Sequence, residues 1–327
     1  MRKVTALILV LSICVCAITA CSGGAKTEEK SDLKSVQTTD QASEKASLES
    51  SEQKKEENKE EGEESPKAET EEKAEKENAL DQEVELVVFA AASLTETLDE
   101  IAKNYKNTAP NVTLIFNFDS SGTLKTQIEE GAACDLFISA AKKQMDQLDI
   151  TADKEVNTEG LDLVDPDTRI DLLENKVVLV VPGDNPASIN SFDDMVKALK
   201  DKSIMLAMGN EDVPVGQYTK KILDHYGLDE ESLNKDGLIT YGSNVKEVTT
   251  QVAEGSVDCG VIYSTDAYSA GLDAVDTATV EMCGQVIYPA ALLKEAAHTE
   301  EAKAFLEYLR SEESAKVFES VGFTCIK

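Results

Sequence analysis

The sequence predicts an α/β protein whose folded part is divided into two lobes. From Val84 onward, short apolar runs rich in β-branched residues alternate with segments of helical spacing, as expected when strands and helices take turns along the chain. This part is about 245 residues long, which is large for one hydrophobic core and comfortable for two. Ligands of such folds bind at the carboxyl ends of strands, so functional residues are expected there.

The first 20 residues have the composition of a signal peptide. Arg2 and Lys3 precede an apolar run that is too short to span a membrane as a mature helix. The run ends in Ile18-Thr19-Ala20-Cys21, which resembles the lipobox of bacterial lipoproteins. That resemblance implies that Cys21 is lipidated and becomes the new N-terminus. The alternatives are a plain signal peptide and an uncleaved anchor.

Residues 21–83 form a tether after the lipidated cysteine. They are rich in Glu, Lys, Ser and Gln and hold almost no large apolar residue, so they cannot bury enough surface to offset the entropy of ordering, and we expect disorder. The whole chain has a net charge of −31, of which the folded body carries about −23. A body this acidic repels nucleic acid and anionic membrane surfaces, and any anion that it binds must be held by neutral dipoles.

The predicted elements alternate along the body, an order that favours mainly parallel sheets. Strands are expected at 84–90, 112–118, 135–139, 176–181, 204–208, 239–241, 260–263 and 286–293. Helices are expected at 94–105, 124–130, 142–148, 191–199, 216–226, 245–253, 300–309 and 314–321.

The first strand ends at a corner suited to an anion. Ser93 lies where the strand gives way to helical spacing, and Glu96 follows three residues later, which predicts a capping box. The first amide groups of a helix have no partner inside it and carry partial positive charge. The corner can therefore bind an anion without a cationic side chain. An ordinary N-cap in a βα unit is the alternative.

Similar corners follow three other strands. Ser120-Ser121-Gly122 offers hydroxyl and amide donors before a helix, and Val213-Pro214-Val215-Gly216 enters a helix that no side chain caps. Asn244 and Glu247 fit a capping pair, which places the Val245 amide in the first helical turn. Each corner alone is explained as well by ordinary capping.

Tyr263 ends the strand at 260–263 and offers a phenolic donor there, with simple core packing as the alternative. Taken together, these corners predict a small dianion held by donors only. Fully deprotonated tetrahedral anions such as molybdate, tungstate and sulfate offer only acceptors. Protonated phosphate carries a donor that would be left unpaired, at a cost of about 1–3 kcal/mol.

Catalytic and metal-binding motifs are absent from the sequence. There is no GxSxG and no GxxxxGK[ST] loop. The histidines, His225 and His298, fall in predicted surface helices, so we expect no enzyme. No Cys/His cluster has metal-ligand spacing, and we expect no metal site and no cofactor. The body contains four cysteines whose pairing the sequence leaves open, namely Cys134, Cys259, Cys283 and Cys325.

From about Val84 to Thr324 the chain resembles the periplasmic molybdate-binding proteins of ABC transporters. The resemblance rests on motifs in the same order, which are Val88-Phe89-Ala90-Ala91-Ala92-Ser93-Leu94, Ser120-Ser121-Gly122-Thr123-Leu124, Ala133-Cys134-Asp135-Leu136-Phe137-Ile138-Ser139-Ala140, Val213-Pro214-Val215-Gly216, Asn244-Val245, Tyr263-Ser264-Thr265-Asp266-Ala267, Tyr288-Pro289 and Gly322-Phe323-Thr324. It implies the type II periplasmic-binding-protein fold, with two α/β lobes, a hinge, and the ligand in the cleft between the lobes. It also implies that hydroxyl and amide donors of Ser93 and Ser121, backbone amides of Val215 and Val245, and the Tyr263 hydroxyl bind molybdate or tungstate.

The same resemblance places lobe 1 at 84–172 and 284–327 and lobe 2 at 173–283, with hinges near 174–176 and 283–285. It implies delivery of the oxyanion to an ABC permease with its ATPase, from a monomer held outside the cytoplasm on the membrane by its lipid. A binding protein for sulfate or another tetrahedral oxyanion is the main alternative, and a hydrolytic enzyme is a remote one.

Overall fold

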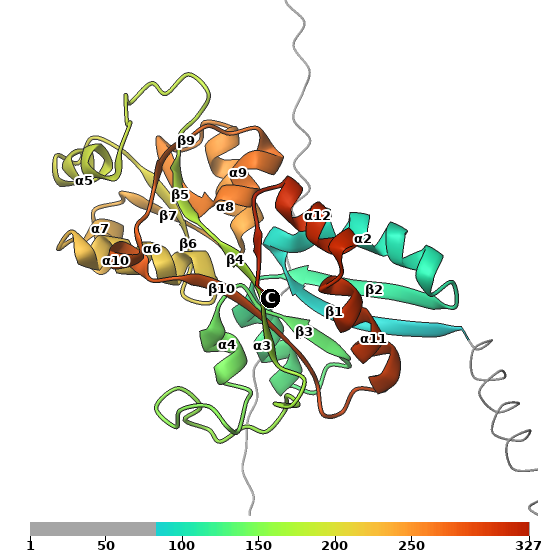
Figure 1. Ribbon diagram of the computed structural model, residues 1–327. Coiled ribbons are helices and arrows are strands. Elements are labelled where there is room, and N and C mark those ends of the chain that lie inside the picture. The colour runs from blue at the N-terminus through green and yellow to red at the C-terminus, as the bar shows by residue number, and fades with distance from the viewer. Residues whose placement is uncertain (1–82, 327) are drawn as a thin grey trace, which may run out of the picture. The chain divides into compact units, whose positions relative to one another are not determined.

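The computed structural model describes residues 83–326 of the chain. The predicted signal peptide, Cys21 and the tether up to residue 82 lie outside these described residues. The strands form two sheets, one of six strands and one of five. Figure 1 shows that strands from both ends of the described chain, cyan β1 and β2 and red β10, belong to the same sheet.

The six-stranded sheet has the order β11-β4-β10-β3-β1-β2. Its strands are β1 (Val84–Ala91), β2 (Val112–Asp119), β3 (Leu136–Ile138), β4 (Ile170–Asn175), β10 (Val286–Leu292) and β11 (Thr324–Cys325). β1 pairs in parallel with β2 and β3, whereas β10 pairs antiparallel with β3 and β4. The sheet and the helices that pack on it are called the first lobe below.

The five-stranded sheet has the order β7-β6-β8-β5-β9. Its strands are β5 (Val177–Val180), β6 (Leu206–Gly209), β7 (Ile239–Gly242), β8 (Cys259–Tyr263) and β9 (Ala274–Thr277). β6 is parallel to β7 and β8, while β5 is antiparallel to β8 and β9. This sheet and its helices are called the second lobe.

Both sheets are therefore mixed, and the expectation of mainly parallel sheets was wrong. The chain leaves the first lobe through β4, and a single residue separates β4 from β5 of the second lobe. It returns through β10, which lies antiparallel beside β4. β4 extends to Asn175 within the first sheet, beyond the lobe boundary expected at 172/173. The boundaries and hinges derived from the resemblance stay predictions.

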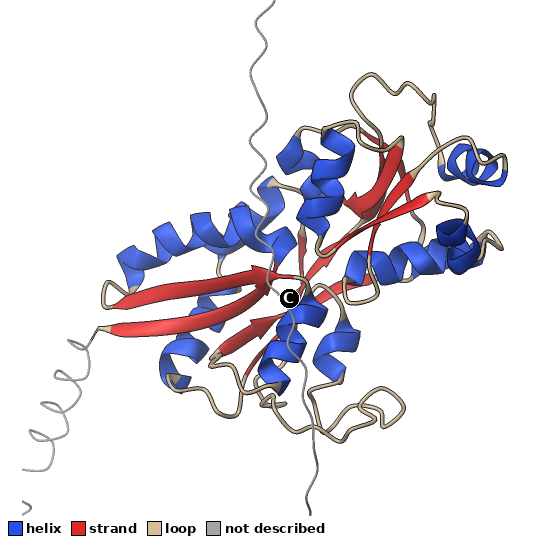
Figure 2. Cartoon of the chain, turned by 180° about the vertical axis from the view of Figure 1, so that it is seen from behind, coloured by secondary structure: helices blue, strands red, loops and turns tan. Residues whose placement is uncertain are grey.

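Helices flank the strands of both sheets (Figure 2). The first lobe carries η1 (Ala92–Leu94), α2 (Thr95–Thr108), α3 (Ser121–Glu129), α4 (Lys142–Asp146), α11 (Thr299–Leu309) and α12 (Glu312–Ser320). The second lobe carries α5 (Phe192–Lys200), α6 (Pro214–His225), α7 (Glu230–Lys235), α8 (Val245–Ala253), α9 (Ser264–Ala270) and α10 (Val280–Cys283). Within residues 83–326, no helix has both the length and the apolar character needed to cross a bilayer.

The core fixes the end of β1 from both of its faces. Val88 belongs to the same buried cluster as Leu98 and Ile101 of α2. The next residue, Phe89, points to the opposite face, as alternate residues of a strand do, and joins a second cluster with Leu124 of α3. Since helices cover both faces, the turn that follows β1 is held in one position.

Candidate functional site

Ser93 lies in a tight turn at the end of β1 rather than at a helix cap. It belongs to the 3₁₀ turn η1, and α2 begins after Leu94 without a side-chain cap. The capping box predicted for Ser93 was therefore wrong. The extra turn moves Ser93 away from the cap position, and its hydroxyl lies 2.9 Å from the hydroxyl of Tyr288 instead.

Tyr288 and Asn175 orient the Ser93 hydroxyl. Asn175 Nδ2 donates to the Tyr288 hydroxyl oxygen at 3.2 Å. Because an amide NH₂ group only donates, the phenolic proton of Tyr288 remains available for Ser93 Oγ. Ser93 then keeps its own proton for a further acceptor. Burial raises the pKa of Tyr288 well above its usual value, which keeps that phenolic proton in place.

Ser121 offers a second hydroxyl proton at the start of α3. Its neighbour Ser120 is the true N-cap and accepts from the Thr123 amide at 3.1 Å. Ser121 is fully buried, and its Oγ accepts from the Ala140 amide at 2.9 Å. Because Ser121 Oγ accepts this hydrogen bond, its own hydroxyl proton is free to be donated to another group.

Helix N-termini of the second lobe present backbone amides. α6 begins after Val213 with no side-chain cap and with Pro214 in its first turn, so the amide of Val215 has no partner inside the helix. In α8 the side chain of Asn244 accepts from the Glu247 amide at 3.1 Å, which confirms the predicted capping pair.

Tyr263 is the last residue of β8 and is 1% exposed. Its hydroxyl oxygen is buried and finds no hydrogen-bond partner among the described residues. Burial raises the pKa of Tyr263 well above its usual value, so the hydroxyl stays protonated and can donate. A buried hydroxyl without a partner costs about 1–3 kcal/mol, which a ligand that accepts from it would recover.

These corners meet at one small cavity between the lobes. It is lined by Ala91, Ala92, Ser93, Asp119, Ser120, Ser121, Ala140, Val213, Pro214, Val245 and Tyr263. The volume of this cavity is about 10 Å³. The structure thus brings together four predicted residues, while Val215 is buried beside the lining residue Pro214 and does not itself line the cavity.

The charges around the cavity were only partly foreseen. The lining includes no lysine, arginine or histidine, but it does include the carboxylate of Asp119. Asp119 Oδ1 accepts from the Ser120 amide at 2.7 Å. The neighbouring cation, Lys246, is held by Glu96 Oε2 at 2.8 Å and by Asp266 Oδ1 at 3.1 Å. The cavity is therefore lined by neutral groups and one carboxylate, whose Oδ1 accepts from the backbone.

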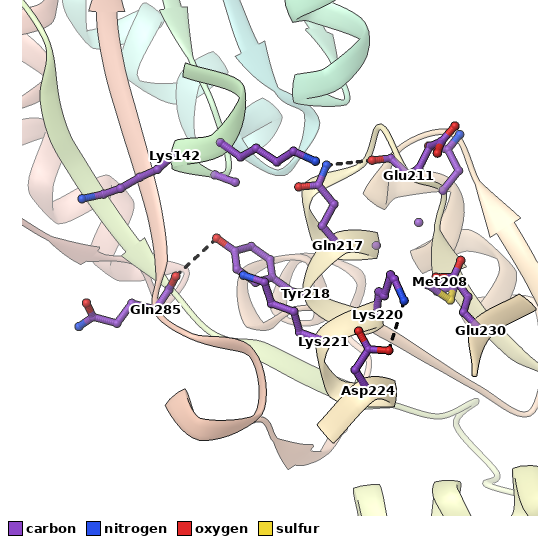
Figure 3. Close-up of a pocket in the computed structure, with 15 residues that line it drawn as sticks. Lys142, Met208, Glu211, Gln217, Tyr218, Lys220, Lys221, Asp224, Glu230 and Gln285 are labelled. Carbon is purple, nitrogen blue, oxygen red and sulfur yellow. Dashed lines mark hydrogen bonds and ion pairs between the residues drawn. The ribbon is translucent and has the colours of Figure 1, made fainter. Parts of the chain in front are cut away.

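A larger cavity, of about 480 Å³, lies beside α6 (Figure 3). Its lining includes the lysines Lys142, Lys143, Lys220 and Lys221, and none of the five predicted residues. Figure 3 shows Lys220 directed at Asp224, at 3.2 Å, and the Tyr218 hydroxyl directed at the Gln285 carbonyl. Lys142 is paired with Asp171 at 2.6 Å. Much of the lysine charge is thus already neutralised by the protein.

The described residues include three buried thiols and no cluster of metal-ligating side chains. Within residues 83–326, no group of three or more His, Cys, Asp or Glu side chains is placed to hold a metal ion. Cys134, Cys259 and Cys283 are free thiols. Burial raises the pKa of both Cys134 and Cys259 to about 12, so these two thiols are protonated and unreactive at neutral pH.

Comparison with known proteins gives the family. Residues 86–324 match the model for bacterial extracellular solute-binding proteins. The chain belongs to this family. The solute-binding protein is 38% identical over 250 residues to a Bacillus subtilis protein assigned as an ABC transporter substrate-binding lipoprotein, covering 75% of this chain and 88% of the relative. It is 34% identical over 253 residues to the molybdate-binding protein of Escherichia coli, covering 76% and 91%.

Solved structures confirm the predicted fold of this solute-binding protein. The periplasmic molybdate-binding protein of Azotobacter vinelandii superimposes with a TM-score of 0.62 at 21% identity, covering 74% of this chain and all of that one. This extracellular solute-binding protein thus has the type II periplasmic-binding-protein fold. Its family consists of binding proteins, which confirms the expectation that it is not an enzyme.

Asp266 makes the stability of this solute-binding protein depend on pH. Burial raises the pKa of its carboxyl to about 6, although Lys246 opposes the shift. Since this lies above the ordinary 3.8, the folded state binds a proton more tightly than the unfolded state. The free energy of unfolding therefore falls as pH rises from about 4 to about 6, and the cost remains above pH 6.

Asp266→Asn should remove this dependence. The difference in unfolding free energy between variant and wild type, measured by urea titration, should move in favour of the variant as pH rises from 4 to 7. A difference that stays constant over this range would contradict the assignment to Asp266.

Proposed function

We propose that the protein captures molybdate or tungstate outside the cytoplasm and delivers it to an ABC permease and its ATPase. The observation that carries the proposal is the Tyr263 hydroxyl, which is buried at the cavity without a partner among the described residues. The hydroxyls of Ser93 and Ser121 line the same space from the first lobe. The 34% sequence identity to the molybdate-binding protein of E. coli supports the same class of ligand.

A fully deprotonated tetrahedral anion fits this set of donors. Each of its oxygens only accepts, and three hydroxyls together with the first-turn amides of α6 and α8 can supply protons from several directions. The Val215 and Val245 amides are proposed as donors on this ground. Monohydrogen phosphate carries a proton that needs an acceptor. Asp119 is the one carboxylate among the lining residues that could accept it.

Anchoring and partners complete the proposal. Lipidation of Cys21 would tie a monomer to the membrane, and the lipoprotein assignment of the B. subtilis relative supports this. The predicted lobes, 84–172 with 284–327 and 173–283, would close over the anion. The permease would then recognise the closed form.

Calorimetric titration of residues 22–327 with four oxyanions tests the ligand. Molybdate and tungstate should bind one to one, at least about 100-fold more tightly than sulfate or phosphate, because an unpaired or poorly matched polar group in a buried site is costly. Equal affinity for sulfate would move the function to sulfate uptake. No heat and no rise in melting temperature with any of the four anions would remove the oxyanion site altogether.

Ser93→Ala should weaken molybdate binding by about 1–3 kcal/mol, or roughly 5- to 150-fold in Kd, because one donor to the anion is lost. Ser320→Ala is the matched control, since Ser320 is exposed and its hydroxyl donates within its own helix to the Val317 carbonyl at 2.7 Å. Equal Kd values for the two variants would exclude Ser93 from the binding site.

A further inference from the structure

The residues of both lobes that line the cavity are mostly buried, so we expect a ligand to reach them when the lobes separate. Ser93, Ser121, Val245 and Tyr263 are 5%, 0%, 4% and 1% exposed. Serines of the first lobe face Val245 and Tyr263 of the second across this space. Contacts that run from lobe to lobe must therefore break during entry and re-form afterwards, and their strength sets how long a ligand is retained.

Lys246 makes such a contact. Its Nζ lies 2.8 Å from both Oε1 and Oε2 of Glu96, which belongs to α2 of the first lobe. Lys246 itself is in the first turn of α8, directly after the cavity residue Val245. The ion pair thus ties the helix end that lines the cavity to the opposite lobe.

Asp266 holds the same ammonium group from within the second lobe. It lies on α9, 3.1 Å from Lys246 Nζ, and its side chain is fully buried. Its Oδ1 is the atom that faces the ammonium group, so the ion pair with Lys246 compensates the buried charge. Lys246 therefore stays in place when the lobes part, whereas Glu96 is engaged only when they meet.

The electrostatics of Lys246 agree with this division of roles. A cation in the first turn of a helix is disfavoured by the helix dipole. Burial by itself would lower the pKa of Lys246, but Asp266 and Glu96 outweigh it and the pKa is raised. The ammonium is thus charged, and it is paired with the carboxylates of Glu96 and Asp266 rather than directed into the cavity.

We propose that Lys246 is a positioning residue that, through Glu96, clasps the two lobes over the ligand. The clasp holds the Val245 end of α8 against the cavity and slows release of the bound anion. This inference rests on the proposed oxyanion function for its ligand, but the clasp itself acts with or without the ligand.

Glu96→Ala tests the clasp, because Glu96 is about half exposed and its removal leaves the Lys246–Asp266 pair intact. In stopped-flow measurements with molybdate, release should be about 2- to 5-fold faster. Added salt should bring wild type toward the variant. Glu231→Ala is the control, since it breaks an exposed ion pair, with Lys235 at 3.1 Å, within the single helix α7. Equal release rates in the two variants would overturn the proposal.

A ligand-free measurement separates the clasp from the proposed function. The Gly122 amide of α3 donates to the Asp212 carbonyl of the second lobe at 3.0 Å, so its hydrogen exchange reports lobe contact. Exchange at Gly122 should be faster in Glu96→Ala than in wild type or Glu231→Ala, whatever anion the protein binds. Unchanged exchange would overturn the clasp, while faster exchange without any molybdate binding would overturn only the proposed function.

Discussion

Replacing Gly122 with alanine is expected to lower the affinity for molybdate by about 10- to 100-fold while each lobe remains folded. At Gly122 the backbones of the two lobes are in direct contact, since its amide donates to the Asp212 carbonyl at 3.0 Å. A Cβ at residue 122 would lie 2.3 Å from that carbonyl oxygen and 2.8 Å from the Asp212 Cα. The main chain of the second lobe would have to retreat, so the donors of the two lobes could no longer reach one ligand.

The measurement is calorimetric affinity together with the melting temperature without ligand. Gly183→Ala is the matched control, because a Cβ there meets nothing within 4 Å. The control should keep wild-type affinity, and both variants should melt close to wild type. Wild-type affinity in Gly122→Ala would show that this contact is not needed for binding.

Tyr263→Phe is expected to change stability and binding in opposite directions. Without ligand, the variant should be more stable by about 1 kcal/mol, because a buried hydroxyl that lacks a partner is removed. With ligand, it should bind molybdate about 10- to 100-fold more weakly, because one donor to the anion is lost. A residue with a purely structural role would not show this pair of opposite effects.

Urea unfolding and calorimetry measure the two quantities on the same preparation. Tyr241→Phe is the control, since the Tyr241 hydroxyl already has a partner, Glu230 Oε1 at 2.9 Å. That variant should gain no stability and lose no affinity. If Tyr263→Phe were destabilised and bound normally, the hydroxyl would be satisfied by the protein rather than reserved for a ligand.

The alternation of strands and helices was enough to predict the elements that carry the site. β1, β6 and β8 were foreseen. The turn after β1 supplies Ser93 to the cavity, and the last residue of β8 is Tyr263. The strand directions were not foreseen. β4 and β9 were missed, and β5, which was predicted at 176–181, runs antiparallel to its neighbours. Apolar runs reveal that a strand exists but do not reveal its direction.

The local role of Ser93 was misjudged for a physical reason. Spacing to Glu96 predicted a capping box, but Glu96 bonds Lys246, 150 residues away, and Ser93 contacts Tyr288, 195 residues away. Local spacing carries no information on partners that the fold brings from so far along the chain. The capping pair of Asn244 and Glu247, which is entirely local, was predicted correctly.

Anomalous scattering at the molybdenum absorption edge, from crystals grown with molybdate, tests the central claim most directly. The claim is that neutral donors of the small cavity hold the anion. It predicts one strong molybdenum peak within hydrogen-bonding reach of the hydroxyls of Ser93, Ser121 and Tyr263. A peak among Lys142, Lys220 and Lys221 of the larger cavity, with none at Tyr263, would contradict it.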